Sequence, residues 1–193
     1  VVRISKAASA EYKARVRSIW LANPGTGKLI SQHASPGCQL ISRVIHQPED
    51  IARFDMALTV AQEDVSPVVI NQLTRPSTPR YDAHASRTLL SWVYSRRPED
   101  IVFASDAEQR VIDYAIAMCS EYDQSIPLVE IADQRRRIAK IAVSVAGQVF
   151  STDAEGRQII VTRDHVDTAR ELFSIWYDKP AMGYRNVSKA KHN

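Results

Sequence analysis

The sequence predicts an α/β protein that is helix-rich overall, with strand-forming segments in its first third and helices in the remainder. Two short apolar segments, residues 18–23 and 53–61, are flanked by chain breakers and are too short for helices, which favours strands. From residue 83 onward the apolar residues recur with the 3.6-residue period of an amphipathic helix. This change of period places the boundary between the two parts near residue 80.

The bulk composition predicts a folded protein of a reducing compartment. The 193 residues are 45% hydrophobic, which is enough to bury a core. The 25 basic residues nearly balance the 22 acidic ones, so any nucleic-acid contact has to be local. The two cysteines lie far apart, which argues against a disulfide framework. No apolar run approaches the roughly 20 residues that span a bilayer, and no signal peptide opens the chain, so we expect neither membrane contact nor secretion.

The first third alternates between expected strands and loops. Residues 1–18 are basic with short apolar stretches and suit a hairpin or an exposed segment. The strand at 18–23 precedes a loop over 24–37, which is rich in glycine, serine and proline, and a helical turn or two follows at 38–46. The second strand, 53–61, precedes a proline-containing stretch. The chain also begins at Val1 inside sequence expected to be ordered, which indicates a fragment of a longer polypeptide.

The helical part contains four expected helices. The first covers 85–97 and stops before Pro98, as a helix should before a proline. In the second, Ser105 and Glu108 form a capping box, followed by a buried face at 111, 115, 118 and 122 with 112, 116 and 119 beside it. The third runs from about 129 to 150, with the apolar residues Ile131, Ile138, Ile141, Ala142, Val145 and Val149 inward.

A turn and a short strand at 152–162 lead into the last helix. Thr162 caps it, and its buried side is expected to consist of Val166, Ala169, Phe173 and either Trp176 or Tyr177. The tryptophans Trp20, Trp92 and Trp176 are expected in the core.

The stretch IWLANPGTGKL, residues 19–29, has two interpretations. Its Gly-Thr-Gly-Lys is similar to the end of a P-loop, but that motif needs glycine at its first position and serine or threonine at its last. Ala22 and Leu29 occupy these positions. The alternative is that Asn23, at the end of a buried strand, presents its amide to a ligand, although an Asn-Pro pair is also an ordinary turn former.

Several segments, in this order, resemble the MCM family of AAA+ replicative DNA helicases. VRISKA and ARVRSIWLANP resemble the hairpin before the sensor 1 strand and that strand with its asparagine. IARFDMALTV resembles the Ser-Arg-Phe-Asp arginine-finger motif, with Ala52 in place of the serine. LLSWVYSRRPEDIVFASDAEQRVID, DQRRRIAKIAVSVA and VTRDHVDTARELF resemble the helical lid with its sensor 2 helix. The resemblance covers about residues 1–177 and indicates a divergent branch.

The resemblance implies a fold and a division of the chain. Residues 1–80 would be the C-terminal part of an AAA+ P-loop NTPase core with the last strands of its parallel sheet. Residues 81–180 would be a mainly α-helical lid subdomain, and 181–193 a basic tail or linker. Neither Walker motif occurs in the 193 residues. By the family pattern both lie upstream, so the isolated chain is expected to be inactive.

The resemblance also assigns candidate nucleotide-binding residues, of which Asn23 and Arg53 are the catalytic candidates. Asn23 would hold the attacking water or the γ-phosphate of ATP. Arg53 would be an arginine finger that reaches the nucleotide of a neighbouring subunit, or else it forms a salt bridge with Asp50 or Asp55. Arg135, or next Arg136, would be sensor 2, although three consecutive arginines are also typical of a solvated helix face.

Basic residues near the start of the chain are the DNA-binding candidates. Lys6 would lie at a hairpin tip in a central channel and contact phosphates, helped by Lys13, Arg15 and Arg17. A solvated basic loop is the alternative. His33, Cys38 and His46 match no zinc spacing, so no metal site is predicted from them.

These assignments imply a subunit of an ATP-dependent DNA helicase in DNA replication. The cofactors would be ATP and Mg²⁺, and the partners single- or double-stranded DNA and further copies in a hexameric ring, in the cytoplasm or at an equivalent nuclear site. Two alternatives stay open: a non-catalytic AAA+-derived DNA-binding or assembly module, and a chelatase-like or chaperone-like remodelling ATPase.

Overall fold

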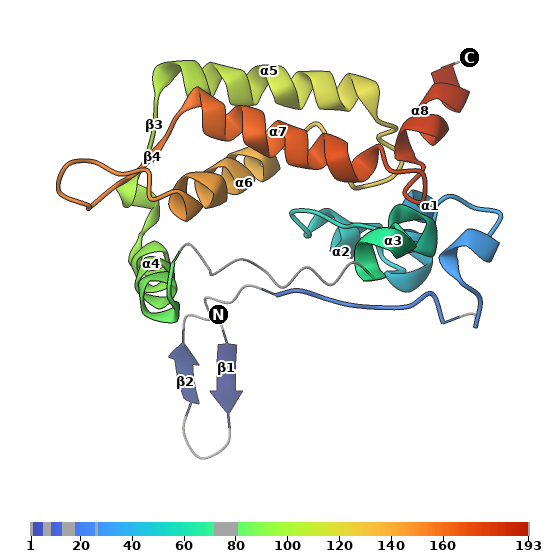
Figure 1. Ribbon diagram of the computed structural model, residues 1–193, viewed down its shortest axis with the longest axis horizontal. Helices are drawn as coiled ribbons and strands as arrows, with labels where there is room; N and C mark the ends of the chain where they lie inside the picture. Colours follow the sequence, from blue (N-terminus) through green and yellow to red (C-terminus); the bar gives the residue numbers. More distant parts are fainter. Residues whose placement is uncertain (1, 6–8, 13–17, 26, 72–80, 193) are drawn as a thin grey trace.

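A computed structural model describes residues 2–5, 9–12, 18–25, 27–71 and 81–192 of the chain. Long helices dominate the part after residue 80, and a two-stranded parallel sheet lies at one end of them (Figure 1). The predicted helix-rich α/β class is therefore confirmed.

The start of the chain forms the expected hairpin. Strands β1 (Val2–Ser5) and β2 (Ser9–Tyr12) pair antiparallel, with Val2 opposite Tyr12 and Ser5 opposite Ser9. In Figure 1 this hairpin projects away from the helices.

The two strands predicted at 18–23 and 53–61 are wrong. The described residues 18–24 contain no regular secondary structure, and Ile19, Trp20 and Leu21 are 90%, 69% and 94% exposed. Residues 54–61 contain no strand either, although Thr59 and Ala61 are buried. An apolar segment becomes a buried strand only when a neighbouring strand accepts its backbone hydrogen bonds, and no such neighbour appears in the described part of the chain.

Short helices lie before and after the predicted second strand. Helix α1 (Gly37–Val44) confirms the expected helix at 38–46, and the 3₁₀ turn η1 (Ile30–Gln32) precedes it. Helix α2 (Pro48–Ala52) begins with a proline and has two acidic residues in its first turn, both typical of a helix start. The turn η2 (Gln62–Asp64) and helix α3 (Pro67–Asn71) follow.

Helix α4 (Ala83–Ser95) confirms the first helix of the helical part. Asp82 caps it, because its Oδ1 accepts a hydrogen bond from the Ala85 N–H at 2.7 Å. After the turn η3 (Pro98–Asp100), strand β3 (Ile101–Phe103) pairs parallel with β4 (Ile159–Val161), Ile101 lying opposite Ile159.

Helices α5 (Ser105–Glu121), α6 (Gln134–Gln148) and α7 (Arg163–Tyr177) pack on one another and build the core. The buried face of α5 is confirmed at Val111, Ala115 and Met118, but Ile116 is 66% exposed. The capping box at Ser105 is wrong, since Ala104 is the N-cap and no side chain caps the helix. On α7, Thr162 is the N-cap as predicted.

The predicted ends of the third helix differ from the structure, and two residues predicted to be buried are therefore exposed. Helix α6 begins at Gln134 rather than near 129, so Ile131 lies before the helix and is 72% exposed. Val149 lies after the helix and is 61% exposed. On α7 the last buried residue is Tyr177, and Trp176 is only partly buried.

The end of the chain differs from the expected tail or linker, because it folds as α8 (Tyr184–His192). Tyr184 is fully buried with Tyr122 and Tyr177, at ring-centroid distances of 4.9 and 5.5 Å. Its hydroxyl donates to the Asp123 carbonyl at 2.8 Å. The same core also contains Cys38, Ile41 and Ile51 from the first third. The division of the chain near residue 80 stays a prediction.

Core burial gives a first prediction. Ile138→Ala, at a fully buried site on α6, should lower the free energy of unfolding by about 2–5 kcal/mol through lost contacts and a cavity. Ile116→Ala, the same change at an exposed site on α5, should change it by no more than about 0.5 kcal/mol. Urea unfolding followed by circular dichroism measures both values, and equal losses would contradict the assignment of the two faces.

The start of α7 predicts a pH dependence. The Thr162 N–H donates to His165 Nδ1 at 3.0 Å, and burial lowers the pKa of His165, with Asp164 acting in the opposite direction. The folded state therefore binds a proton less readily than the unfolded chain, whose histidine pKa is about 6.5. Stability from this group is present above pH about 6.5 and is lost as the pH falls through the lower folded-state pKa. His165→Gln keeps an acceptor without titrating, so thermal unfolding of this variant should lose less stability between pH 7.5 and 5; an identical loss would exclude His165 as the cause.

Candidate functional site

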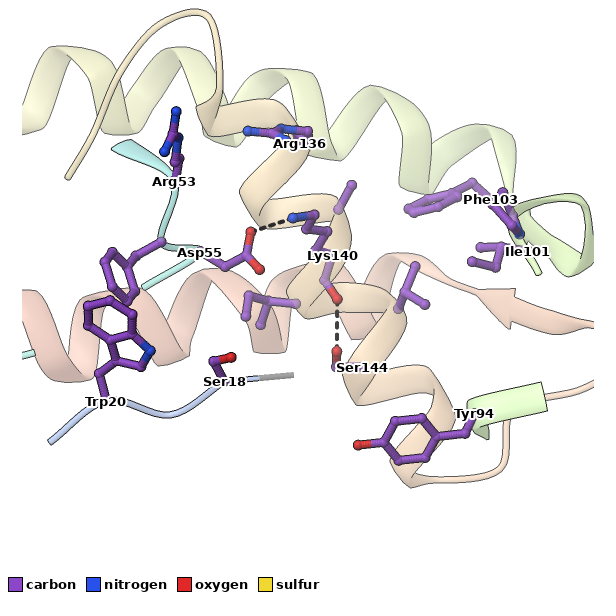
Figure 2. A pocket seen from close by; sticks show the side chains of 15 residues that line it. Ser18, Trp20, Arg53, Asp55, Tyr94, Ile101, Phe103, Arg136, Lys140 and Ser144 are labelled. Atoms are coloured by element: carbon purple, nitrogen blue, oxygen red, sulfur yellow. Dashed lines mark hydrogen bonds and ion pairs between the residues drawn. The ribbon is translucent and has the colours of Figure 1, made fainter. Parts of the chain in front are cut away.

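An open groove of about 930 Å³ lies between α6 and the segment that follows α2. Its walls come from α6, from residues 53–55, from Ser18 and Trp20, and from the end of α4 and β3. Figure 2 shows Arg53 and Asp55 on one side of this groove and Arg136, Lys140 and Ser144 along α6 on the other. Residues distant in the sequence therefore form one concave surface.

Three cations line the groove, and each is paired with a carboxylate. Arg53 Nη1 lies 2.9 Å from Asp50 Oδ1, and Arg136 Nη2 lies 2.9 Å from Asp133 Oδ1. Lys140 Nζ lies 2.7 Å from Asp55 Oδ1. The three cationic side chains stay 79%, 55% and 48% exposed, in the order given. Exposed pairs of this kind contribute only about 0–1 kcal/mol, so an incoming anion can replace Asp50 and Asp133 beside the two arginines at small cost.

A second, smaller groove of about 330 Å³ lies beside the first. Arg53 and Arg136 line both grooves, and Glu49, Glu130 and Asp133 contribute acidic groups to the smaller one. The two arginines therefore lie at the ridge between the two grooves. A planar guanidinium donates in a fork that matches phosphate or carboxylate oxygens, so this ridge suits a ligand with several anionic oxygens.

Local structure explains why these side chains meet. Arg53 is the C-cap residue of the short helix α2, whose Ile51 is buried in the core. Arg136 and Lys140 lie four residues apart on α6, which places them on the same helix face one turn apart. The buried Ile138 fixes the opposite face of α6, so the basic pair is turned outward.

The rim of the groove carries an exposed tryptophan. The Trp20 ring meets the Phe54 ring edge-on, with centroids 5.4 Å apart and an interplanar angle of 79°. This contact holds the start of segment 18–23 against the residue that follows Arg53. The expectation that all three tryptophans are in the core is wrong for Trp20, while Trp92 and Trp176 are partly buried against the core.

The structure separates the predicted nucleotide-binding residues into two groups. Arg53 and Arg136 come together at the groove. Arg135 is exposed on α6 and lines neither groove, so of the two predicted sensor 2 candidates only the second reaches the site. Asn23 is exposed and is not among the groove residues. The DNA-binding candidates Lys6, Lys13, Arg15 and Arg17 lie outside the described residues.

One arginine behind the site was missed by the sequence analysis. Arg137 is 1% exposed, and its guanidinium donates to the carbonyls of Leu128, Pro127 and Ala52. A signal was available, because Gln134, Arg137, Ile138 and Ala142 share one face of the helical period, and the last two were predicted to be buried. The three consecutive arginines of α6 therefore have different surroundings, and only Arg136 faces the groove.

The residues considered for a metal do not gather in space. Cys38 is fully buried, and burial raises the pKa of its thiol to about 11, whereas His46 is exposed. Throughout the described ranges, no three histidine, cysteine, aspartate or glutamate side chains are grouped so that they could hold a metal ion. Over these same ranges, no helix has the length and apolar character needed to cross a bilayer.

Comparisons of the chain with protein-family models, with curated proteins and with solved structures found no match.

The exposure of Trp20 gives a prediction that tests the corrected structure. Trp20→Phe should remove most of the tryptophan fluorescence that acrylamide quenches efficiently, because Trp20 is 69% exposed and Trp92 and Trp176 are partly buried. Trp176→Phe is the matched control and should leave the intensity of the quenchable emission almost unchanged. A quenchable fraction that is insensitive to Trp20→Phe would instead support the buried strand predicted from the sequence.

Proposed function

We propose that this chain is the C-terminal part of the AAA+ ATPase module of an MCM-like DNA helicase subunit, acting in a hexameric ring. The observation that supports the proposal best is the meeting of Arg53 and Arg136 at one groove. The two residues come from separate motifs, the arginine-finger segment and the sensor 2 helix. The part after residue 80 would then be the helical lid of the module, whereas the core strands expected at 18–23 and 53–61 are absent from the described residues.

The chemistry of phosphoryl transfer suits this pair of arginines. Such reactions need little covalent help from the protein and depend on positioning and on stabilisation of negative charge. Arg53 and Arg136 are exposed on a ridge, where they can reach the phosphates of a nucleotide bound by a neighbouring subunit. Lys140 lines the same groove, where it is paired with Asp55.

Asn23 would act at a different nucleotide in this proposal. It is exposed and lies outside the groove that contains Arg53. A sensor asparagine that serves the chain's own nucleotide and an arginine that serves the next subunit's nucleotide are expected on separate surfaces. The separation of these two side chains is compatible with that division of roles.

ATP and Mg²⁺ fit this chain only in part. The groove offers cations that suit phosphate oxygens, but the 193 residues contain neither a Walker A nor a Walker B motif. ATP supplies the γ-phosphoryl group when it is bound, and most ligands of Mg²⁺ would come from residues outside these 193. We therefore expect the isolated chain neither to bind ATP tightly nor to hydrolyse it.

The finger role predicts the effect of one substitution in a ring that contains the Walker motifs. Arg53→Ala should lower kcat for ATP hydrolysis by about 10³-fold or more and spare nucleotide binding, because the lost charge acts on the transferring phosphoryl group. Arg136→Ala should lower kcat by about 10²-fold. The exposed neighbour Arg135 is the matched control, and Arg135→Ala should change kcat by less than about twofold, the effect expected of a solvated side chain. Steady-state ATPase assays measure all three variants.

Subunit mixing tests whether Arg53 acts on a neighbour. Mixed rings of Arg53→Ala subunits with subunits defective in Walker A should recover activity, since some interfaces then combine an intact finger with an intact phosphate cradle. Unchanged hydrolysis in pure Arg53→Ala rings would remove the finger role. Clear ATPase activity of the isolated chain would contradict the proposal as a whole.

DNA binding separates the helicase from a remodelling ATPase. Lys6→Ala should weaken salt-dependent binding of single-stranded DNA if the hairpin contacts phosphates. Hydrolysis with undisturbed DNA binding would favour the remodelling ATPase, and DNA binding without any hydrolysis would favour a non-catalytic module.

A further inference from the structure

The most unusual side chain in the core is the cation of Arg137. It is 1% exposed, and in the described part of the chain no carboxylate forms an ion pair with it. A buried charge is expensive unless hydrogen bonds satisfy it, so a guanidinium in this place needs a strong structural reason.

The partners of Arg137 are backbone carbonyls from two separate segments. Nη1 donates to the Leu128 carbonyl, and Nη2 donates to the Ala52 carbonyl at 2.6 Å and to the Pro127 carbonyl at 3.3 Å. Ala52 is the last residue of α2, and the last carbonyls of a helix have no partner within the helix. A cation at this end also interacts favourably with the helix dipole. Arg137 of α6 therefore closes the C-terminus of α2.

A second contact joins α6 to the segment that follows α2, on the other side of Arg53. Lys140, one turn after Arg136 on α6, pairs with Asp55 at 2.7 Å. The tethers from α6 thus hold residues 52 and 55, and Arg53 lies between them. Figure 2 shows the Lys140–Asp55 contact between α6, which carries Arg136, and the segment that carries Arg53.

We propose that Arg137 is a positioning residue which, with the Lys140–Asp55 pair, fixes Arg53 at a set distance from Arg136. This inference rests on the proposed function, in which both arginines act on the same phosphates. The side chains of Arg53 and Arg136 pair with Asp50 and Asp133 of their own segments, so their spacing depends on how α2 is attached to α6. Ile51 is buried in the core and α2 also contacts α1, so without the tethers the start of α2 would still be held. The end of α2 with Arg53 would be held less firmly, with the Trp20–Phe54 ring contact as its remaining neighbour.

Arginine is specifically suited to this role. The guanidinium uses two different nitrogens for carbonyls on two segments, which a single ammonium group cannot reproduce. Arg137→Lys therefore keeps the positive charge and loses the pair of hydrogen bonds that joins the Leu128 and Ala52 carbonyls. Arg135→Lys is the matched control, because Arg135 is exposed two residues earlier on the same helix.

Hydrogen exchange on the 193-residue chain measures the positioning without any nucleotide. The N–H groups of Ile51, Arg53 and Phe54 are hydrogen-bonded within the α2 turn, so their exchange reports its opening. In Arg137→Lys these amides should exchange about tenfold faster, and amides in the middle of α7 should be unchanged. In Arg135→Lys all of them should exchange as in the wild type. A folded Arg137→Lys chain with wild-type exchange at these amides overturns the proposal.

A second set of variants tests the proposal even if the Arg137→Lys chain does not fold. Lys140→Asp and Asp55→Lys change half-exposed side chains and should each speed exchange of the same amides, whereas the double variant, which restores an ion pair, should return it toward the wild-type rate. If neither single variant has an effect, or if the double variant gives no recovery, the pair does not hold Arg53 in place and the proposal fails.

The catalytic consequence is measured separately in an active ring. Arg137→Lys should lower kcat by about 10- to 100-fold with the KM for ATP unchanged, because a displaced Arg53 no longer meets the transferring group. If Arg53→Ala itself leaves hydrolysis intact, the proposed function fails, and hydrogen exchange still decides whether Arg137 positions α2. Faster exchange with an unchanged kcat, in a ring where Arg53→Ala is inactive, overturns the positioning role.

Discussion

A guanidinium held only by backbone carbonyls joins the short helices of the first third to the helical part. Arg137 leaves water and binds the carbonyls of Ala52, Pro127 and Leu128, while its Nε has no partner among the described residues. The cost of burying this charge is offset by hydrogen bonds that backbone carbonyls would otherwise lack. The position of Arg53 in the groove depends on this junction, since it sets where α2 ends relative to α6.

Helix α6 organises the groove because three of its residues face three environments. Arg136 faces solvent at the ridge between the two grooves, Arg137 faces the core, and Lys140 reaches Asp55. One rigid element therefore carries a cation for the ligand and both attachments that place Arg53. The loop 122–130 that precedes α6 is in turn held by α8, through Tyr184 and Ser188 at Asp123. Helix α8 therefore stabilises the loop whose carbonyls bind Arg137.

The elements that follow from a long helical period of apolar residues were predicted correctly. The elements that need a neighbouring strand were not. The burial of Val111, Ala115 and Met118, and of Val166, Ala169 and Phe173, follows from helical spacing, which is a local property. The strands at 18–23 and 53–61 were wrong, because apolar composition does not say whether a neighbouring strand is available. The predicted boundaries of α6 and the predicted capping box of α5 were also wrong, since helix ends depend on competing local hydrogen bonds.

The sequence by itself determined the amphipathic helices and the basic character of residues 135–137, and it left a hairpin or an exposed segment as alternatives for residues 1–18. It also marked Arg53 and Arg136 as candidates for an anionic ligand. Only the tertiary structure decided that these two arginines share a groove, that Arg135 does not reach it, and that Arg137 is buried. The reason is that a helical period gives the direction of each side chain around its own helix, whereas the surface that it meets is fixed by contacts between segments distant in the chain.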